Sequence, residues 1–136
     1  MKIQRLHTTD DVVAFNPEKI RNTNVFIFVY LESCPYCVQM QPEWNTFKEN
    51  MKKSKNLQIV EINKNIVNKV ILADREYFSE KLKNVQFVPN LSLYTKTKKT
   101  FNYIGDRSSE DLVNFTKTVL TKAKPLTQKE RVRRTL

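Results

Sequence analysis

Segments rich in β-branched and aromatic residues alternate with amphipathic segments along the chain, and the former predict five β-strands. These strands span residues 3–6, 24–31, 57–62, 91–94 and 101–104. The second and third are apolar enough to predict strands that are covered on both faces of a sheet. The cationic loop 96–99 is too polar to be buried, and it predicts a hairpin between the last two strands.

An apolar stripe with helical spacing predicts a long helix over residues 35–53. Its members recur at intervals of three and four, which places them on one face of a helix. They are Cys37, Met40, Trp44, Phe47 and Met51. Pro35 suits the first helical position, where a missing N–H costs nothing, whereas Pro42 falls inside the helix and is expected to kink it.

Three further helices are predicted from start signals and apolar spacing. The run Thr8-Thr9-Asp10-Asp11 resembles a helix start, and Pro17 limits that first helix. Apolar spacing predicts one continuous helix over residues 67–84. Ser108 precedes Asp111 by three residues in a capping-box arrangement that predicts the start of a last helix. The buried face of this last helix is predicted to carry Leu112, Phe115 and Val119.

The order of these segments predicts an α/β fold, because strands and helices alternate before the final hairpin and helix. At 136 residues the chain has the size of one domain and can bury a core without metal or disulfide staples. We expect one domain over residues 1–123. Residues 124–136 are expected to form a basic C-terminal tail.

The chain carries a formal net charge of +10, which attracts acidic surfaces, anionic lipids or nucleic acid. Lysine and asparagine are abundant while Gly105 is the single glycine, so an AT-rich coding sequence would explain much of the charge. The tail has no aromatic side chain on which a base could stack. We therefore expect no nucleic-acid partner.

No segment predicts a secretory leader or a membrane span. The longest apolar stretch, residues 25–31, is too short to cross a bilayer. We expect a soluble, intracellular monomer without a membrane partner. A virion would be a further location if the gene were viral.

The only two cysteines, Cys34 and Cys37, lie at the predicted junction of a strand and a helix. With only His7 as a further soft ligand, they cannot complete a four-ligand zinc site, so no metal is expected. A helix N-terminus favours a thiolate, so Cys34 is the expected nucleophile. Cys37 lies one turn later on the apolar stripe, and its shielded thiol is expected to titrate higher and to act as the resolving thiol.

The expected chemistry is disulfide exchange. The Cys34 thiolate attacks a substrate disulfide, and Cys37 then releases the reduced substrate while the Cys34–Cys37 disulfide closes. No cofactor is needed beyond an external thiol or reductase that resets the pair. Tyr36, between the cysteines, is the aromatic residue that we expect at the rim of the site. His7 receives no role.

The sequence resembles the thioredoxin family from about residue 24 to residue 120. The resemblance rests on the cysteine pair after the central strand, on Pro42 five residues after the second cysteine, on Val88-Pro89 before a strand, and on Gly105 after the next one. It implies a thioredoxin fold, with a central mixed sheet of four to five strands flanked by about four helices. It also implies a cis bond before Pro89 and contact of Val88 and Pro89 with substrate.

Several positions depart from that family. The Pro-Tyr pair between the cysteines resembles glutaredoxins, and Ser33 stands where thioredoxins carry tryptophan. Phe28 occupies the position of the buried acid that helps proton transfer to the second thiol. Glu61, on the neighbouring strand, is a candidate replacement.

The leading interpretation is an enzyme that exchanges disulfides with protein substrates, in electron transport and cell redox homeostasis. Its reductant would be a thioredoxin reductase or the glutathione system. One alternative is a glutaredoxin-like, glutathione-dependent enzyme, although the short turn with which glutaredoxins hold glutathione is missing. Another is a non-catalytic binding module that holds an acidic partner with its tail and loop 96–99.

Overall fold

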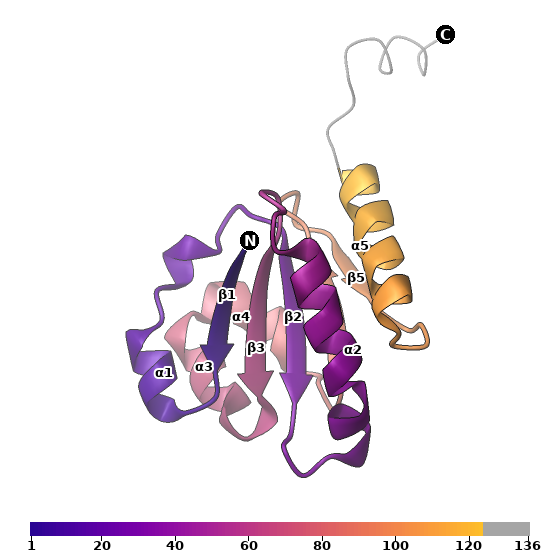
Figure 1. Cartoon of the computed structure of the whole chain (residues 1–136). Coiled ribbons are helices and arrows are strands. Elements are labelled where there is room, and N and C mark those ends of the chain that lie inside the picture. Colours follow the sequence, from indigo (N-terminus) through magenta and orange to yellow (C-terminus); the bar gives the residue numbers. More distant parts are fainter. Residues whose placement is uncertain (124–136) are drawn as a thin grey trace, which may run out of the picture.

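A five-stranded mixed sheet forms the centre of the computed structural model, which describes residues 1–123 (Figure 1). The strand order is β1-β3-β2-β4-β5. The strands are β1 Lys2–Leu6, β2 Val25–Tyr30, β3 Gln58–Asn63, β4 Asn90–Tyr94 and β5 Thr100–Asn102. All five predicted strands are therefore present, and the predicted basic tail at 124–136 lies outside the described residues.

The central strand β2 pairs parallel with β3 and antiparallel with β4. Its first five residues are all buried, as its apolar run predicts. Alternate side chains point to opposite faces of a strand. Phe26 and Phe28 accordingly join one core cluster, and Val25, Ile27 and Val29 join the other.

Helices cover both faces of the sheet (Figure 1). They are α1 Thr9–Ala14, α2 Pro35–Met51, α3 Val67–Ala73, α4 Arg75–Leu82 and α5 Ser109–Ala123, with short 3-10 turns at Pro17–Lys19 and Lys64–Ile66. Buried residues of α2 and α5 pack on the face that carries Phe26. Buried residues of α3 and α4 pack on the opposite face. The structure confirms the predicted α/β thioredoxin fold, with five helices instead of about four.

The long helix α2 begins at Pro35 and continues through Pro42 to Met51. All five members of its predicted apolar stripe are buried. Trp44 and Phe47 are completely enclosed and pack against Phe26 of β2. This packing fixes the N-terminal end of α2, and with it the cysteines, at the carboxyl end of the central strand.

The first and last predicted helix starts are also present. The Thr8 hydroxyl accepts a hydrogen bond from the Asp11 N–H at 3.2 Å, and the Asp11 carboxylate accepts one from the Thr8 N–H at 2.9 Å. This reciprocal pair is the capping box that begins α1. At α5, the Ser108 hydroxyl accepts from the Asp111 N–H at 3.1 Å.

The prediction of a single helix over 67–84 is wrong, because the segment forms two helices, α3 and α4, that are separated at Asp74. Asp74 leaves the helical region, with φ −157° and ψ 88°, and its carboxylate accepts a hydrogen bond from the Tyr77 N–H at 3.1 Å. The other carboxylate oxygen binds Arg21 at 2.5 Å. An Asp at an N-cap accepts a hydrogen bond from an otherwise unpaired helix N–H. Asp74 therefore favours the start of a new helix over the continuation of α3.

The last strand is also shorter than predicted. β5 ends at Asn102, and Ile104 is 95% exposed. The chain turns away because the Tyr103 hydroxyl donates to the Asp111 carboxylate at 2.6 Å, which ties the loop to the start of α5. A Cβ at Gly105 would collide with both of those groups, which explains the single glycine at this turn.

Within residues 1–123, no helix is both long enough and apolar enough to cross a bilayer.

Candidate functional site

The two cysteines lie at the N-terminal end of α2. Cys34 is the N-cap residue, Pro35 occupies the first helical position, and the Cys37 N–H donates to the Cys34 sulfur at 3.3 Å. Cys34 is partly exposed, whereas Cys37 is only 4% exposed. The outer sulfur is therefore partly exposed and accepts an N–H from the first turn of the helix, whereas the inner sulfur is buried.

This placement gives the two thiols opposite acidities. Burial alone would raise the pKa of Cys34, but hydrogen bonds from Cys37 and from the Tyr36 backbone, together with the charge of Arg107, lower it below the ordinary value. Burial raises the pKa of Cys37 to about 11, and its hydrogen bond to Cys34 contributes to the shift. A stabilised outer thiolate above a protonated inner thiol is the order of acidities that a nucleophile and a resolving thiol require.

Arg107 is a contributor that the sequence analysis missed. It lies in the loop between β5 and α5 in the left-handed region, with φ 67°, and its N–H donates to the Tyr103 hydroxyl at 3.0 Å. Its positive charge contributes to the lowered pKa of Cys34 and opposes the rise in the pKa of Cys37. Only the fold brings this loop beside α2, so nothing in the sequence distinguishes Arg107 from the other 23 cationic residues, since lysine and arginine total 24.

The segment predicted to contact substrate lies opposite the outer cysteine. The Val88–Pro89 peptide bond is cis, and the Val88 carbonyl accepts a hydrogen bond from Cys34 Sγ at 3.6 Å. Two exposed aromatic side chains flank this contact in sequence: Tyr36 is 63% exposed and Phe87 is 79% exposed. The structure thus brings Cys34, Tyr36 and Val88 into one surface region, and the sequence analysis did not single out Phe87.

A cavity of about 420 Å³ lies beside the inner cysteine. Its lining includes Phe28, Tyr30, Glu32, Cys37, Lys48 and Glu61. Phe28 packs against Trp44 with ring centroids 4.7 Å apart, so an apolar ring stands where the resemblance to thioredoxins implies a buried acid. Glu61 and Cys37 therefore share one hollow although they lie on different elements.

Glu61 is buried and fully engaged. Its carboxylate accepts hydrogen bonds from Trp44 Nε1 at 2.5 Å, from Lys48 Nζ at 2.9 Å and from Arg5 Nε at 3.0 Å. Burial alone would raise the pKa of Glu61, but the bonds from Lys48 and Trp44 outweigh burial and lower it. Glu61 is consequently an anion at neutral pH rather than a solvent-facing strand residue.

His7, to which the sequence analysis assigned no role, also reaches this region. Its Nδ1 lies 2.8 Å from the Tyr30 hydroxyl and its Nε2 lies 3.1 Å from Glu32. Burial raises the pKa of Tyr30 to about 12, so this phenol remains protonated. His7 therefore holds two of the residues that line the cavity beside Cys37.

Metal ligation has no candidate among residues 1–123, since no group of three or more His, Cys, Asp or Glu side chains is close enough to hold an ion.

The family follows from a direct match. The Thioredoxin family model matches residues 7–118, which is most of the 136-residue chain. The chain belongs to the thioredoxin family. Family membership and the spacing of the two cysteines together support thiol–disulfide chemistry at the level of the family.

Solved structures share the fold at low sequence identity. The J-Trx1 fragment of ERdj5 is 23% identical with a TM-score of 0.56, over 88% of this chain and 52% of that one. The first thioredoxin domain of mouse protein disulfide-isomerase A4 is 19% identical with a TM-score of 0.56, over 91% and 77%. A thiol:disulfide interchange protein from Chlorobium tepidum TLS is 15% identical with a TM-score of 0.55, over 76% and 84%. This chain thus spans about half of the ERdj5 fragment.

Proposed function

We propose that this protein exchanges disulfides with protein substrates, with Cys34 as the nucleophile and Cys37 as the resolving thiol. The observation that supports this most strongly is the placement of the two thiols at the N-terminus of α2, where Cys34 accepts the Cys37 N–H and is partly exposed while Cys37 is buried. The pKa of Cys34 is lowered and the pKa of Cys37 is raised to about 11. A non-catalytic binding module has no need of this difference.

The reaction follows from the geometry. The Cys34 thiolate attacks one sulfur of a substrate disulfide, forms a mixed disulfide and releases the other substrate sulfur as a thiolate. Cys37 then loses its proton and attacks the Cys34 sulfur. The second substrate thiolate leaves, so two electrons have moved to the substrate and the Cys34–Cys37 disulfide has formed. An external dithiol or reductase returns the two electrons.

The proposed substrate site is the surface beside Cys34. An extended substrate segment would lie along Val88 and Pro89, because the Val88 carbonyl already lies 3.6 Å from the reacting sulfur. Tyr36 and Phe87 supply exposed aromatic area next to it. Apolar surface of this kind favours unfolded or partly folded protein segments over small hydrophilic thiols.

Glu61 is the proposed acceptor for the Cys37 proton. It is an anion at neutral pH and lines the same cavity as Cys37, so water in the cavity can carry the proton between them. Its three hydrogen bonds hold it in place and also lower its pKa, so Glu61 would be a weak base that holds the proton only transiently. Glu61 would then replace the family acid whose position Phe28 occupies.

The test is reduction of insulin disulfides with dithiothreitol as electron donor. The wild-type protein is expected to accelerate reduction, and Cys34→Ser is expected to abolish the acceleration. Supplying electrons from thioredoxin reductase in one assay and from glutathione with glutathione reductase in another identifies the natural partner. Equal rates for the wild type and Cys34→Ser would overturn the proposed function.

A further inference from the structure

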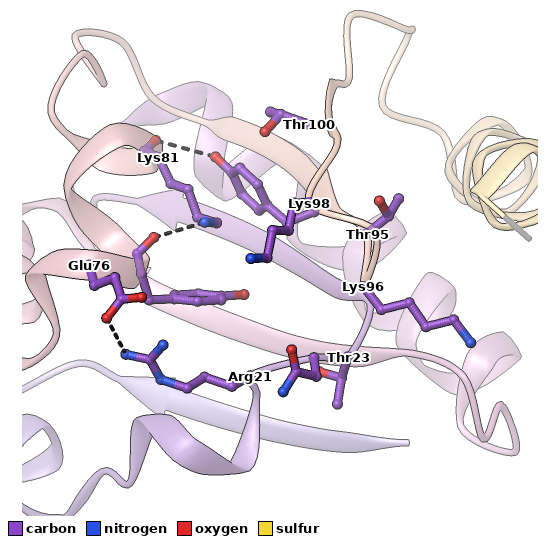
Figure 2. Close-up of a pocket in the computed structure, with 11 residues that line it drawn as sticks. Arg21, Thr23, Glu76, Lys81, Thr95, Lys96, Lys98 and Thr100 are labelled. Atoms are coloured by element: carbon purple, nitrogen blue, oxygen red, sulfur yellow. Dashed lines mark hydrogen bonds and ion pairs between the residues drawn. The ribbon is translucent and has the colours of Figure 1, made fainter. Parts of the chain in front are cut away.

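Figure 2 shows a second cavity, of about 350 Å³. It lies at the end of the sheet opposite the cysteines. Its lining includes Arg21, Glu76, Tyr77, Lys81, Tyr94 and Lys98. It adjoins the start of β2, where Val25 pairs with Tyr94, whereas the cysteines follow the other end of the same strand. The five intervals between its six residues, at about 3.3 Å each, separate the two ends by roughly 17 Å.

Contacts with Tyr77 and Tyr94 hold the side chain of Lys81, on α4, beside this cavity. Its ammonium donates to the Tyr77 carbonyl at 2.8 Å and lies 4.1 Å from the Tyr77 ring centroid and 5.1 Å from the Tyr94 ring centroid. Burial lowers the pKa of Lys81, so the charge is partly desolvated. An anion beside the ammonium would compensate that loss of solvation.

Lys98 approaches the same cavity from the β4–β5 hairpin. Figure 2 shows its ammonium extended over the cavity, whereas the side chain of Lys96 points away from it. The turn is fixed, because the Lys98 N–H donates to the Thr95 carbonyl at 2.9 Å and the Lys96 N–H donates to Asn24 Oδ1 at 2.8 Å. Lys98 itself lies in the left-handed region, with φ 67°, where a lysine is uncommon.

The nearby carboxylates are engaged by Arg21 and leave both lysines unpaired. Arg21 contacts Asp74 at 2.5 Å, Glu18 at 3.1 Å and Glu76 at 3.8 Å. Across the described part of the chain, neither Lys81 nor Lys98 lies within ion-pair distance of a carboxylate. Two ammonium groups without an ion-pair partner therefore face one cavity, and the carboxylate that also lines it, Glu76, lies 3.8 Å from Arg21.

One of the lining residues, Tyr77, also carries an unused hydrogen-bond donor. The hydroxyl of Tyr77 is buried and has no hydrogen-bond partner among residues 1–123. A buried hydroxyl without a partner is costly, and most such groups in proteins are satisfied. A ligand oxygen in the cavity would satisfy this one.

We propose that this cavity binds a phosphate group, free or on a small organic molecule, through Lys81, Lys98 and the Tyr77 hydroxyl. Two unpaired ammonium groups and a neutral donor match an anion that carries a double charge and several acceptor oxygens. The volume is at the lower end of the range typical of small-molecule sites, so a compact ligand fits. The site lies apart from the cysteines and is independent of the proposed disulfide exchange.

The test is a titration of the full chain with inorganic phosphate, followed by backbone amide NMR at constant ionic strength. Saturable shifts are expected at residues 95–100 and in α4. A parallel titration with phenyl phosphate identifies the source: tighter binding assigns an organic phosphate, and equal binding assigns free phosphate. Absence of saturable shifts at these residues with both probes would overturn the proposal.

Two variants distinguish specific binding in this cavity from nonspecific attraction of phosphate to a positively charged protein. Lys98→Asn removes the ammonium but keeps a residue that tolerates positive φ, and it should weaken binding about tenfold. Lys99→Asn is the matched control, because it removes the same charge from the same loop without lining the cavity, and affinity should change less than twofold. Equal losses in the two variants would show diffuse attraction and contradict the proposal.

Tyr77→Phe tests the hydroxyl without changing charge. Phosphate affinity should fall severalfold while the thermal unfolding midpoint stays the same or rises, because the lost hydroxyl has no partner within the described residues. Unchanged affinity in Tyr77→Phe would remove the hydroxyl from the site.

Discussion

At the scale of single residues, the proposed chemistry depends on the different surroundings of two cysteines at the N-terminus of α2. Cys34 caps α2 and accepts the Cys37 N–H, whereas Cys37 is enclosed by the apolar stripe of the same helix. The spacing in the sequence was sufficient to predict which thiol is outer and which is inner. It could not supply Arg107, whose charge comes from a loop about 70 residues further along the chain.

The first prediction concerns this arginine. Arg107 stabilises the Cys34 thiolate, so Arg107→Gln should raise the pKa of Cys34. A raised pKa lowers the fraction of Cys34 that is thiolate at any pH below that pKa. The rate of Cys34 alkylation by iodoacetamide at pH 6 should therefore fall about two- to fivefold. The measurement is the alkylation rate between pH 5 and pH 10, in a Cys37→Ser background so that one thiol reacts.

Arg75→Gln is the matched control, because Arg75 is an exposed arginine at the start of α4. Its alkylation profile should overlay that of the parent. If Arg75→Gln and Arg107→Gln shift the profile equally, net charge rather than the position of Arg107 sets the acidity of Cys34.

At the scale of elements, polar side chains determine helix boundaries that apolar spacing alone does not predict. The pattern over 67–84 predicted one helix because its apolar residues keep helical spacing on both sides of Asp74. The structure breaks there because the Asp74 side chain caps α4 and binds Arg21, a contact 53 residues distant in sequence. Long apolar segments such as β2 and α2 were predictable, since their burial follows from their own composition.

Glu61 connects three elements and carries the second prediction. It joins β3 to Arg5 of β1 and to Trp44 and Lys48 of α2. Glu61→Gln removes the charge from these bonds and should lower the free energy of unfolding at pH 7 by about 2 kcal/mol. Chemical denaturation of both proteins checks this value.

The pH dependence of that loss follows from the lowered pKa of Glu61. A carboxylate whose pKa is lower in the folded state stabilises the fold above its unfolded pKa of about 4.3 and loses the effect as pH falls through the folded pKa. The difference in free energy of unfolding between wild type and Glu61→Gln should therefore be largest at pH 7 and should shrink below about pH 4. A difference that stays constant with pH would contradict the lowered pKa of Glu61.

The same variant tests the proposed proton transfer. Resolution of a preformed mixed disulfide by Cys37 should slow in Glu61→Gln, and its pH profile should shift upward. Attack on substrate by Cys34 should keep its rate. An unchanged pH profile for resolution would exclude Glu61 as the acceptor.

At the scale of the whole molecule, the central strand separates two regions of different character. One end of β2 leads to the cysteines and to Val88, and the other end adjoins the cavity with Lys81 and Lys98. The α/β class, the strand segments and the cysteine pair were all predictable from local pattern. The second cavity was not predictable, because its two lysines come from α4 and from the β4–β5 hairpin, which are different elements in different parts of the chain.

The most direct test of the Cys34/Cys37 assignment is trapping of the mixed disulfide. Cys37→Ser removes the resolving thiol, so incubation with an oxidised protein substrate should accumulate a covalent complex through Cys34, identified by peptide mass spectrometry and reversed by dithiothreitol. Cys34→Ser, which keeps only the buried thiol, should form little complex. A complex that forms equally well in Cys34→Ser, or none in Cys37→Ser, would contradict the assignment of Cys34 as the nucleophile.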